Sequence, residues 1–279
     1  MHISAAFAAS PPCPPGGPPL PDRGAFTRAI PETGVAGLPG GRDPPHPRRA
    51  VLGGAALAAL GAVVPGARAG TDAASLRSDY NRYSAGYDDL DGGAAADALG
   101  FADLRRALLA LARGDVLETA IGTGLNLPQY PRGGEVGALT GLDVSEGMLG
   151  QAERKAPGAP FPVTLVRGDV AAMPFPDAAF DTVVDTFSLC VFPDPAAAVR
   201  EMARVLRPGG SLLLLEHTRS ALPLLGAYQD ATAGPVAATG KGCVWNQDVR
   251  ALVAAAGLEV RRCDPVLLGT VSTIVATKR

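Results

Sequence analysis

Acidic side chains and glycines recur at the points where predicted strands end. Glu118 ends one apolar segment and is followed by a turn that contains Gly122 and Gly124. Asp143 ends the next apolar segment, and Asp169 ends the one after it. Paired glycines let the backbone adopt positive φ and approach a ligand closely, and carboxylates at strand ends accept hydrogen bonds from hydroxyls and amines. The pattern therefore indicates a ligand that carries several hydroxyl and amino groups.

The spacing of these residues indicates a nucleoside. Asp143 follows Gly122 by about 20 residues, the position from which an acid accepts hydrogen bonds from both hydroxyls of a ribose. Asp169 is placed to accept a hydrogen bond from the exocyclic amine of adenine. Met148 is either a contact of the base or an ordinary core methionine. For both aspartates the other interpretation is a helix N-cap.

The turn distinguishes between nucleotides. A dinucleotide site has the pattern G-x-G-x-x-G, but Leu127 stands at the third glycine position. Glu118, just before the turn, would repel a pyrophosphate and would suit a ligand with an ammonium and a sulfonium group. These residues favour S-adenosylmethionine over NAD. An NAD(P)-dependent Rossmann oxidoreductase and a non-catalytic binding module stay as alternatives.

Strand and helix patterns alternate along the chain and must position these residues. Segment 222–238 fits either a helix or a loop. Regular alternation predicts an α/β fold with a Rossmann-like, doubly wound and mostly parallel sheet in three α/β/α layers, which binds ligands at the carboxyl ends of its strands. Strands are predicted at 115–120, 135–143, 163–170, 180–189, 211–216, 258–264 and 271–278, and helices at 76–90, 94–112, 145–156, 195–206 and 246–256.

Five segments resemble the ordered motifs of the class I S-adenosylmethionine-dependent methyltransferases of the type 11 group. The resemblance spans about residues 75–279. It implies seven strands with the last one antiparallel, S-adenosyl-L-methionine as cofactor and a small-molecule acceptor. The segments are VLETAIGTG (116–124), GLDVSEGML (141–149), GDVAAMPF (168–175), FDTVV (180–184) and RVLRPGG (204–210).

The resemblance also implies roles for the matching residues. The methionine part of the cofactor would lie against Glu118, Gly122 and Gly124. Ala120, where the family usually has glycine, and Val144 lie in the same motifs and are expected to bind the cofactor too. Asp143 would hold the ribose, with Met148 against the base. The remaining contacts are Asp169 and Val170 at the adenine and Thr186 beside the reacting methyl group.

A narrower resemblance, to organelle-membrane methyltransferase-like proteins, rests on the tyrosine-rich first helix, DTVVDTFSLC (181–190), the Glu-His pair at 216–217 and the Gly-Cys pair at 242–243. Some of those proteins methylate thiols, so a lipophilic or thiol acceptor is implied. His217, the one histidine after the leader, is either a general base or a structural residue. Tyr80, Tyr83 and Tyr87 form either a lid or part of the core. No metal is predicted, because the cysteines lack C-x-x-C spacing and no His/Cys cluster is visible.

Composition separates a leader from the enzyme domain. The 279 residues include 25 Lys+Arg and 27 Asp+Glu, which excludes a protein that coats nucleic acid electrostatically. Residues 1–69 hold half of the 26 prolines, and they contain Arg48-Arg49, an uncharged run at 50–67 and Ala67-Arg68-Ala69. They are predicted to be a disordered transit peptide plus a twin-arginine signal directed to the chloroplast or its thylakoid. Alternatively, segment 50–67 anchors the protein to an organelle membrane. Residues 70–279 are the predicted methyltransferase domain, and peripheral membrane association is compatible with it.

Overall fold

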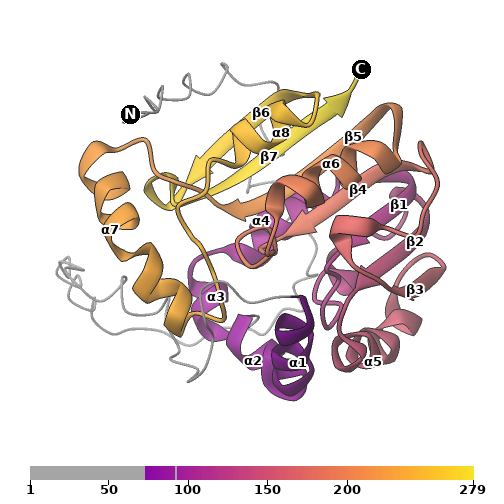
Figure 1. The fold of residues 1–279 in the computed structure, drawn as a ribbon. Coiled ribbons are helices and arrows are strands. Elements are labelled where there is room, and N and C mark those ends of the chain that lie inside the picture. The colour runs from indigo at the N-terminus through magenta and orange to yellow at the C-terminus, as the bar shows by residue number, and fades with distance from the viewer. Residues whose placement is uncertain (1–72, 92) are drawn as a thin grey trace, which may run out of the picture.

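The computed structural model describes residues 73–91 and 93–279, which build a seven-stranded sheet with helices on both faces (Figure 1). The strand order is β3-β2-β1-β4-β5-β7-β6. β7 pairs antiparallel with both neighbours, whereas the other pairs are parallel. The predicted α/β fold with an antiparallel last strand is thereby confirmed. The strands are β1 Arg113–Thr119, β2 Glu135–Asp143, β3 Val163–Arg167, β4 Phe180–Thr186, β5 Leu206–His217, β6 Leu258–Val266 and β7 Val271–Lys278.

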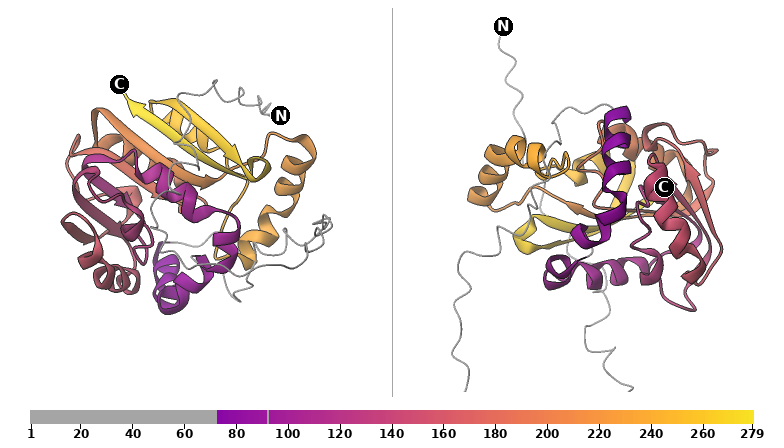
Figure 2. Two further views of the ribbon diagram at one scale, coloured as in Figure 1. Left: turned by 180° about the vertical axis from the view of Figure 1, so that it is seen from behind. Right: turned by 90° about the horizontal axis from the view of Figure 1, so that it is seen from below.

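The leucine run of β5 explains why helices cover both faces of the sheet. Leu212 and Leu214 belong to one core cluster with α6 (Pro195–Val205) and α8 (Val249–Ala255). Leu213 and Leu215 belong to the other cluster, with α4 (Phe101–Leu109). Successive side chains of a strand point to opposite faces, so a fully apolar run needs a covered sheet on both sides. Figure 2 shows α4 on the side of the sheet turned away in Figure 1.

Two predicted helices are broken in the structure. The segment predicted at 76–90 is α1 (Ala73–Tyr83) and α2 (Tyr87–Asp91), joined by a 3-10 turn. The segment predicted at 94–112 is α3 (Ala94–Ala98) and α4, separated at Gly100, whose φ of 76° is left-handed. A residue with left-handed φ, such as Gly100, ends one helix and redirects the chain before the next helix. Helical periodicity does not detect these breaks, so the sequence predicted one continuous helix in each segment.

Strand and helix ends also shift from the prediction. β3 and β4 end earlier than predicted, at Arg167 and Thr186, so that the following residues are free to line the sheet edge. α6 stops at Val205, and β5 begins at Leu206 instead of the predicted residue 211, so that it includes the Pro-Gly-Gly segment. α5 (Glu146–Lys155) is N-capped by Ser145, the first residue of the predicted helix, whose side chain accepts from the amide of Met148.

The segment 222–238, which the sequence left open, is mainly the helix α7 (Pro223–Thr239). It stands apart from the sheet at one end of the molecule and runs toward α1, α2 and α3 (Figure 1). Within the described part of the chain no helix has the length and apolar character needed to cross a bilayer. The predicted leader, the anchor segment 50–67 and the domain boundary after residue 69 lie outside the described residues.

Candidate active site

A pocket of about 160 Å³ lies at the carboxyl ends of the central strands. Its wall comes from the turns that follow β1, β2, β3 and β4, and from the N-terminal helices α1 and α2. The structure brings eight of the predicted cofactor-binding residues into this one wall: Ala120, Gly122, Asp143, Val144, Met148, Asp169, Val170 and Thr186. These positions are far apart in sequence, and the parallel register of the strands places them at one edge.

The turn after β1 has the backbone shape expected of a glycine-rich loop. Gly122 and Gly124 have φ of 57° and 77°. A Cβ at Gly124 would lie 2.9 Å from Leu127 Cδ1 and 3.2 Å from Ala152 Cα, so the loop packs closely on α5. Ala120 also has a positive φ, 46°. An alanine in that region costs about 1 kcal/mol or more in backbone strain, which is the physical reason for glycine at this place in the family.

Asp143 is joined to this turn by its carboxylate. Oδ2 accepts a hydrogen bond from the amide of Gly122 at 2.9 Å, and Oδ1 accepts one from the amide of Ser145 at 2.8 Å. Burial raises the pKa of the Asp143 carboxyl to about 6, although these backbone bonds favour its ionised form. Ser145 caps α5, so Asp143 is not the N-cap that the alternative interpretation supposed. The buried carboxylate instead ties the β1 and β2 turns together at the pocket wall.

Asp169 and Met148 have positions that are compatible with both of their interpretations. Asp169 accepts a hydrogen bond from the amide of Ala171 at 2.8 Å and caps the short 3-10 helix Val170–Ala172, yet it also lines the pocket. Met148 is 1% exposed and nonetheless forms part of the pocket wall. Their predicted contacts with adenine stay predictions, and their positions at the wall are compatible with them.

Glu118 and Gly124 are not among the residues that line the pocket. Glu118 is buried behind the turn, where it accepts from Asn126 Nδ2 at 3.0 Å and from the Tyr130 hydroxyl at 2.9 Å. Burial raises the pKa of Glu118 to about 7, against the effect of these two bonds. Its predicted contact with the methionine part of a cofactor stays a prediction, and the geometry shows a carboxyl that organises the loop from behind.

Asn126 supports the pocket wall from behind, and the sequence analysis did not single it out. Besides Glu118, its Nδ2 contacts Thr186 Oγ1 at 3.1 Å, and its Oδ1 accepts from Arg105 Nε at 3.1 Å. It thus connects Glu118 on β1 with Thr186, the pocket residue at the end of β4. A polar residue inside the otherwise apolar stretch after the paired glycines was the only available signal.

His217 is not among the residues that line the pocket. Its ring packs against Phe187, with centroids 5.1 Å apart, and Phe187 itself lines the pocket. The Nδ1 atom of His217 faces Cys243 Sγ at 3.5 Å. His217 therefore lies one side chain behind the wall, and its predicted role as a general base stays a prediction.

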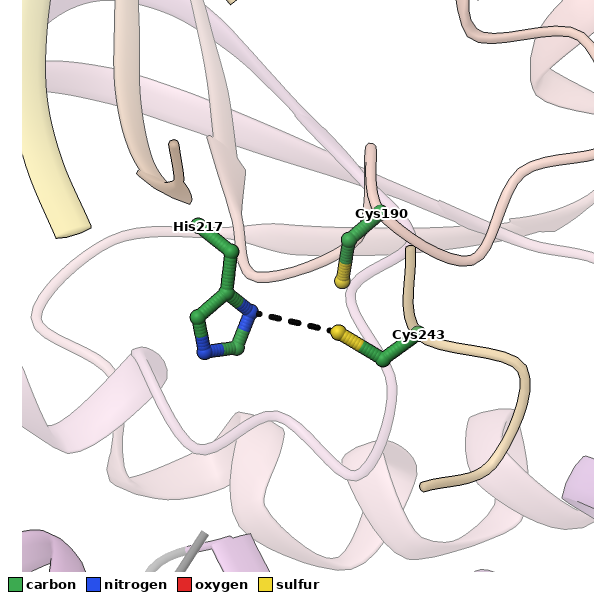
Figure 3. Close-up of side chains that lie close together, drawn as sticks. All are labelled: Cys190, His217 and Cys243. Carbon is green, nitrogen blue, oxygen red and sulfur yellow. Dashed lines mark hydrogen bonds between the residues drawn. The ribbon is translucent and has the colours of Figure 1, made fainter. Parts of the chain in front are cut away.

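The sequence interpretation that no His/Cys cluster exists is wrong. Cys190, His217 and Cys243 come together at the β4–β5 edge, with their ligand atoms within 4.8 Å of one another (Figure 3). These residues have no motif spacing, because a strand order of β4-β5 and the long α7 connection bring them together. A hydrogen bond to Cys243, burial and the nearby Glu216 and Asp185 carboxyls raise the pKa of the Cys190 thiol.

Two buried carboxyls extend the polar region beneath the β4 turn. Asp185 accepts from Thr119 Oγ1 at 2.9 Å and also from the Ser188 hydroxyl. Glu216 accepts from the amide of Ser188 at 3.1 Å. Burial raises the pKa of both acids, and that of Asp185 to about 6. Since Ser188 lines the pocket, these acids fix the backbone of the β4 turn from behind.

Much of the remaining wall is apolar and aromatic, and Asp194 adds a carboxylate to it. Tyr80 and Tyr87 line the pocket, whereas Tyr83 does not, so the predicted tyrosine face divides between the pocket and its surroundings. The Lys241 ammonium lies 4.4 Å from the centre of the Tyr87 ring, which connects the end of α7 to α2. The other apolar lining residues are Leu76, Leu142, Ala171, Phe187, Val191, Phe192 and Pro193.

The sequence is similar to those of several known methyltransferases. Residues 117–214 match a family model described as a methyltransferase domain. The phosphatidylethanolamine N-methyltransferase of Cereibacter sphaeroides is 36% identical over 170 residues, covering 60% of this chain and 80% of that protein. The ubiquinone/menaquinone biosynthesis C-methyltransferase UbiE of Bdellovibrio bacteriovorus is 32% identical over 157 residues, covering 54% and 66%. The mitochondrial methyltransferase OMS1 of Saccharomyces cerevisiae is 31% identical over 193 residues, covering 63% and 40%.

Solved structures share the fold. The cyclase SpnF matches with a TM-score of 0.62 and 19% identity, covering 77% of this chain and 99% of that one. An O-methyltransferase family protein from Burkholderia thailandensis matches with a TM-score of 0.56 and 20% identity, covering 74% and 62%.

The fold, the strand-end pocket and these relatives define the class of the protein. The chain belongs to the class I S-adenosylmethionine-dependent methyltransferase family. It is an enzyme that uses S-adenosylmethionine and has small-molecule methyltransferases among its relatives, and nothing in the comparisons supports the NAD alternative. The residues present fit this cofactor, because an ionisable carboxylate, backbone amides in a tight turn and an apolar wall surround one pocket.

Proposed function

We propose that the enzyme methylates a small lipophilic acceptor at a membrane surface. The observation that carries this proposal is the apolar part of the pocket wall, to which Tyr80, Tyr87, Val191 and Phe192 belong. An apolar wall binds an acceptor by excluding water from its hydrocarbon surface. The relatives named for phosphatidylethanolamine and for quinone biosynthesis support the same acceptor class.

The proposed mechanism depends on holding the acceptor in line with the methyl group and on excluding water from the pocket. Bound S-adenosylmethionine supplies a methyl group that its sulfonium has already activated. In the proposal Asp143 holds the ribose hydroxyls, and the turn at Thr186 and Ser188 lies beside the reacting methyl group. Phe187, Tyr80 and Tyr87 keep water out. Holding an acceptor in line supplies several kcal/mol of the barrier, on the order of 7 or more in favourable cases.

The proton balance is compatible with an amine acceptor that exchanges its protons with water. The described residues that line the pocket include no lysine and no histidine. A primary amine is mostly protonated at neutral pH, so it first gives a proton to water. The neutral amine then attacks the methyl carbon through its lone pair as the S–CH₃ bond breaks, and the product ammonium can lose its proton to water afterwards, so solvent can accept both protons. Quinols and thiols ionise before attack and would gain from a base such as His217, which lies behind Phe187.

Transfer of labelled methyl groups tests the acceptor class. The full chain is incubated with labelled S-adenosylmethionine and vesicles that carry phosphatidylethanolamine, a demethylated quinol or a long-chain thiol. Water-soluble amines and thiols serve as comparison acceptors. The proposal expects label in the organic phase, with the amine lipid favoured. Label only on water-soluble acceptors would overturn it, and Asp143→Ala provides the background rate.

Membrane association is part of the proposal. Leu224 is 90% exposed and Leu268 is 73% exposed. Ser220 joins their segments, because its hydroxyl donates to the carbonyl of Leu268 at 2.6 Å and accepts from the amide of Leu222 at 3.2 Å. Exposed leucines from two adjoining segments can insert at the headgroup boundary of a bilayer, and each buried leucine contributes about 1.5–3 kcal/mol.

Sedimentation with phospholipid vesicles tests this surface. Leu224→Glu should reduce the bound fraction several-fold, since it places a charge where a leucine would enter the bilayer. Ala254→Glu is the matched control, because it adds the same charge at an exposed position of α8. Equal loss in both variants would attribute binding to net charge and would refute the insertion of Leu224.

The localisation of the enzyme is also part of the proposal, and it rests on the sequence of the leader. Arg48-Arg49, the uncharged run 50–67 and Ala67-Arg68-Ala69 support a cleaved address directed to the chloroplast, with thylakoid targeting through the twin-arginine pair. Import into isolated chloroplasts followed by N-terminal sequencing tests this. A new N-terminus near residue 70 is expected, and an imported chain that still begins at Met1 would contradict cleavage and favour the anchor.

A further inference from the structure

A sulfur and nitrogen cluster lies beside the pocket but is not part of its wall. Cys190 belongs to the turn after β4, His217 is the last residue of β5, and Cys243 lies in the turn after α7. Figure 3 shows the three side chains directed toward one another from these separate segments. Their ligand atoms lie within 4.8 Å of one another, and the Cys243 Sγ to His217 Nδ1 distance is 3.5 Å.

We propose that Cys190, His217 and Cys243 bind a zinc ion. A tetrahedral zinc with its usual bond lengths to sulfur and to nitrogen separates a sulfur ligand from a nitrogen ligand by about 3.6 Å, and two sulfur ligands by about 3.8 Å. The Cys243–His217 distance already has this value. Two thiolates and an imidazole form a donor set that favours zinc over the oxygen-preferring ions magnesium and calcium.

The backbone around the cluster holds the ligands in place. The amide of Val244 donates to the carbonyl of Cys190 at 2.7 Å, which fastens the turn after α7 to the turn after β4. Gly242, with a φ of 86°, turns the chain immediately before Cys243. The His217 ring is fixed by its packing against Phe187. These contacts mean that a metal needs only small side-chain movements to complete its bonds.

The partial solvent exposure of the cluster allows an ion to reach it. Cys190 is buried, whereas His217 and Cys243 are half-buried. Binding converts two thiols to thiolates and releases two protons, while His217 binds as neutral imidazole through Nδ1, so that the site carries no net charge and no electrons are transferred. Three protein ligands leave a fourth position of the tetrahedron for water or another small ligand. The ion would hold together the β4 turn, the end of β5 and the turn after α7.

This site does not depend on the identity of the methyl acceptor, so it can be tested separately. The full chain is purified under reducing conditions, supplied with zinc and dialysed, and the metal content per chain is measured. Cobalt is then substituted, because tetrahedral thiolate ligation of cobalt gives intense visible bands and a sulfur-to-cobalt charge-transfer band. We expect one zinc per chain, both cobalt signatures and a rise in melting temperature when zinc is added.

Single serine substitutions identify the ligands. Cys190→Ser and Cys243→Ser should each weaken zinc binding by about tenfold or more and remove part of the charge-transfer intensity. Cys263→Ser is the matched control, because Cys263 is a buried thiol on β6 that is not in the cluster. Circular dichroism in the absence of metal shows which variants fold. If one of the thiol variants does not fold, His217→Asn replaces it as a ligand variant.

Three results would overturn the proposal. One is a reduced, folded chain that retains no zinc after dialysis. Another is metal content that is unchanged in both Cys190→Ser and Cys243→Ser. The last is a cobalt spectrum of six-coordinate type without a sulfur band, which would place the metal on carboxylates elsewhere.

Discussion

Replacing Glu118 with glutamine should make the free energy of unfolding less dependent on pH. Glu118 is 2% exposed, and burial raises its pKa from 4.5 to about 7. The folded chain therefore binds a proton at Glu118 that the unfolded chain has lost over this range of pH. Because the folded state binds more protons, its stability falls as pH rises from about 4.5 to about 7. Glutamine removes this titration and keeps an oxygen that can accept from Asn126.

The magnitude follows from the two pKa values. Between pH 5 and pH 8 the cost of ionising a buried carboxyl with these values grows by about 2.5 kcal/mol. The wild type should lose this amount relative to Glu118→Gln over the same interval. At pH 5, where the folded carboxyl is protonated, the two proteins should differ much less, since both side chains are then neutral.

Urea unfolding at pH 5, 6, 7 and 8 measures the effect through the difference between the two proteins at each pH. This difference cancels the titration of the other buried acids, Asp143, Asp185 and Glu216. Glu153→Gln, at an exposed position of α5, is the control for removal of a carboxylate that is not buried. A difference between wild type and Glu118→Gln that stays constant from pH 5 to pH 8 would refute the buried, proton-binding state of Glu118.

Two further predictions concern the pocket. Asp143→Asn should weaken S-adenosylhomocysteine binding by about 10- to 100-fold in calorimetry, since a hydrogen bond to a charged acceptor contributes about 1.5–3 kcal/mol. Wild-type affinity should decline below about pH 6 as Asp143 gains its proton, and equal affinity in both proteins would remove the ribose assignment. Gly124→Ala should lower stability by about 1–3 kcal/mol in urea unfolding, because the new Cβ adopts positive φ and meets Leu127. Gly150→Ala, on α5 with open space around it, is the control and should cost nothing, and equal loss in both variants would contradict the packing argument.

The sequence predicted the features that depend on local patterns. β2 and β7 have the predicted bounds, since apolar runs bounded by glycines or charges fix a strand without help from distant contacts. The positions of Asp143 and Asp169 at the pocket wall follow from the same logic, because parallel strands bring their carboxyl ends to one edge. The broken helices were not predictable from periodicity, which does not detect the reversal at Gly100.

Contacts between distant segments were beyond sequence reasoning. Glu118 was expected to face the ligand, but whether a strand-end acid points forward or backward depends on partners such as Asn126 and Tyr130. His217 was predicted to be either a general base or a structural residue, but its separation from the pocket by Phe187 depends on how the β4 turn folds back. The meeting of Cys190 with Cys243 requires the path of α7, which the sequence left undetermined.

A crystal structure of the protein with S-adenosylhomocysteine tests the central claim most directly, which is that the pocket at the carboxyl ends of β1 to β4 holds the cofactor. The account predicts density in that pocket, with the ribose hydroxyls at the Asp143 carboxylate and the adenine beside Asp169. Density for the ligand at any other surface, or ribose hydroxyls that make no contact with Asp143, would contradict it.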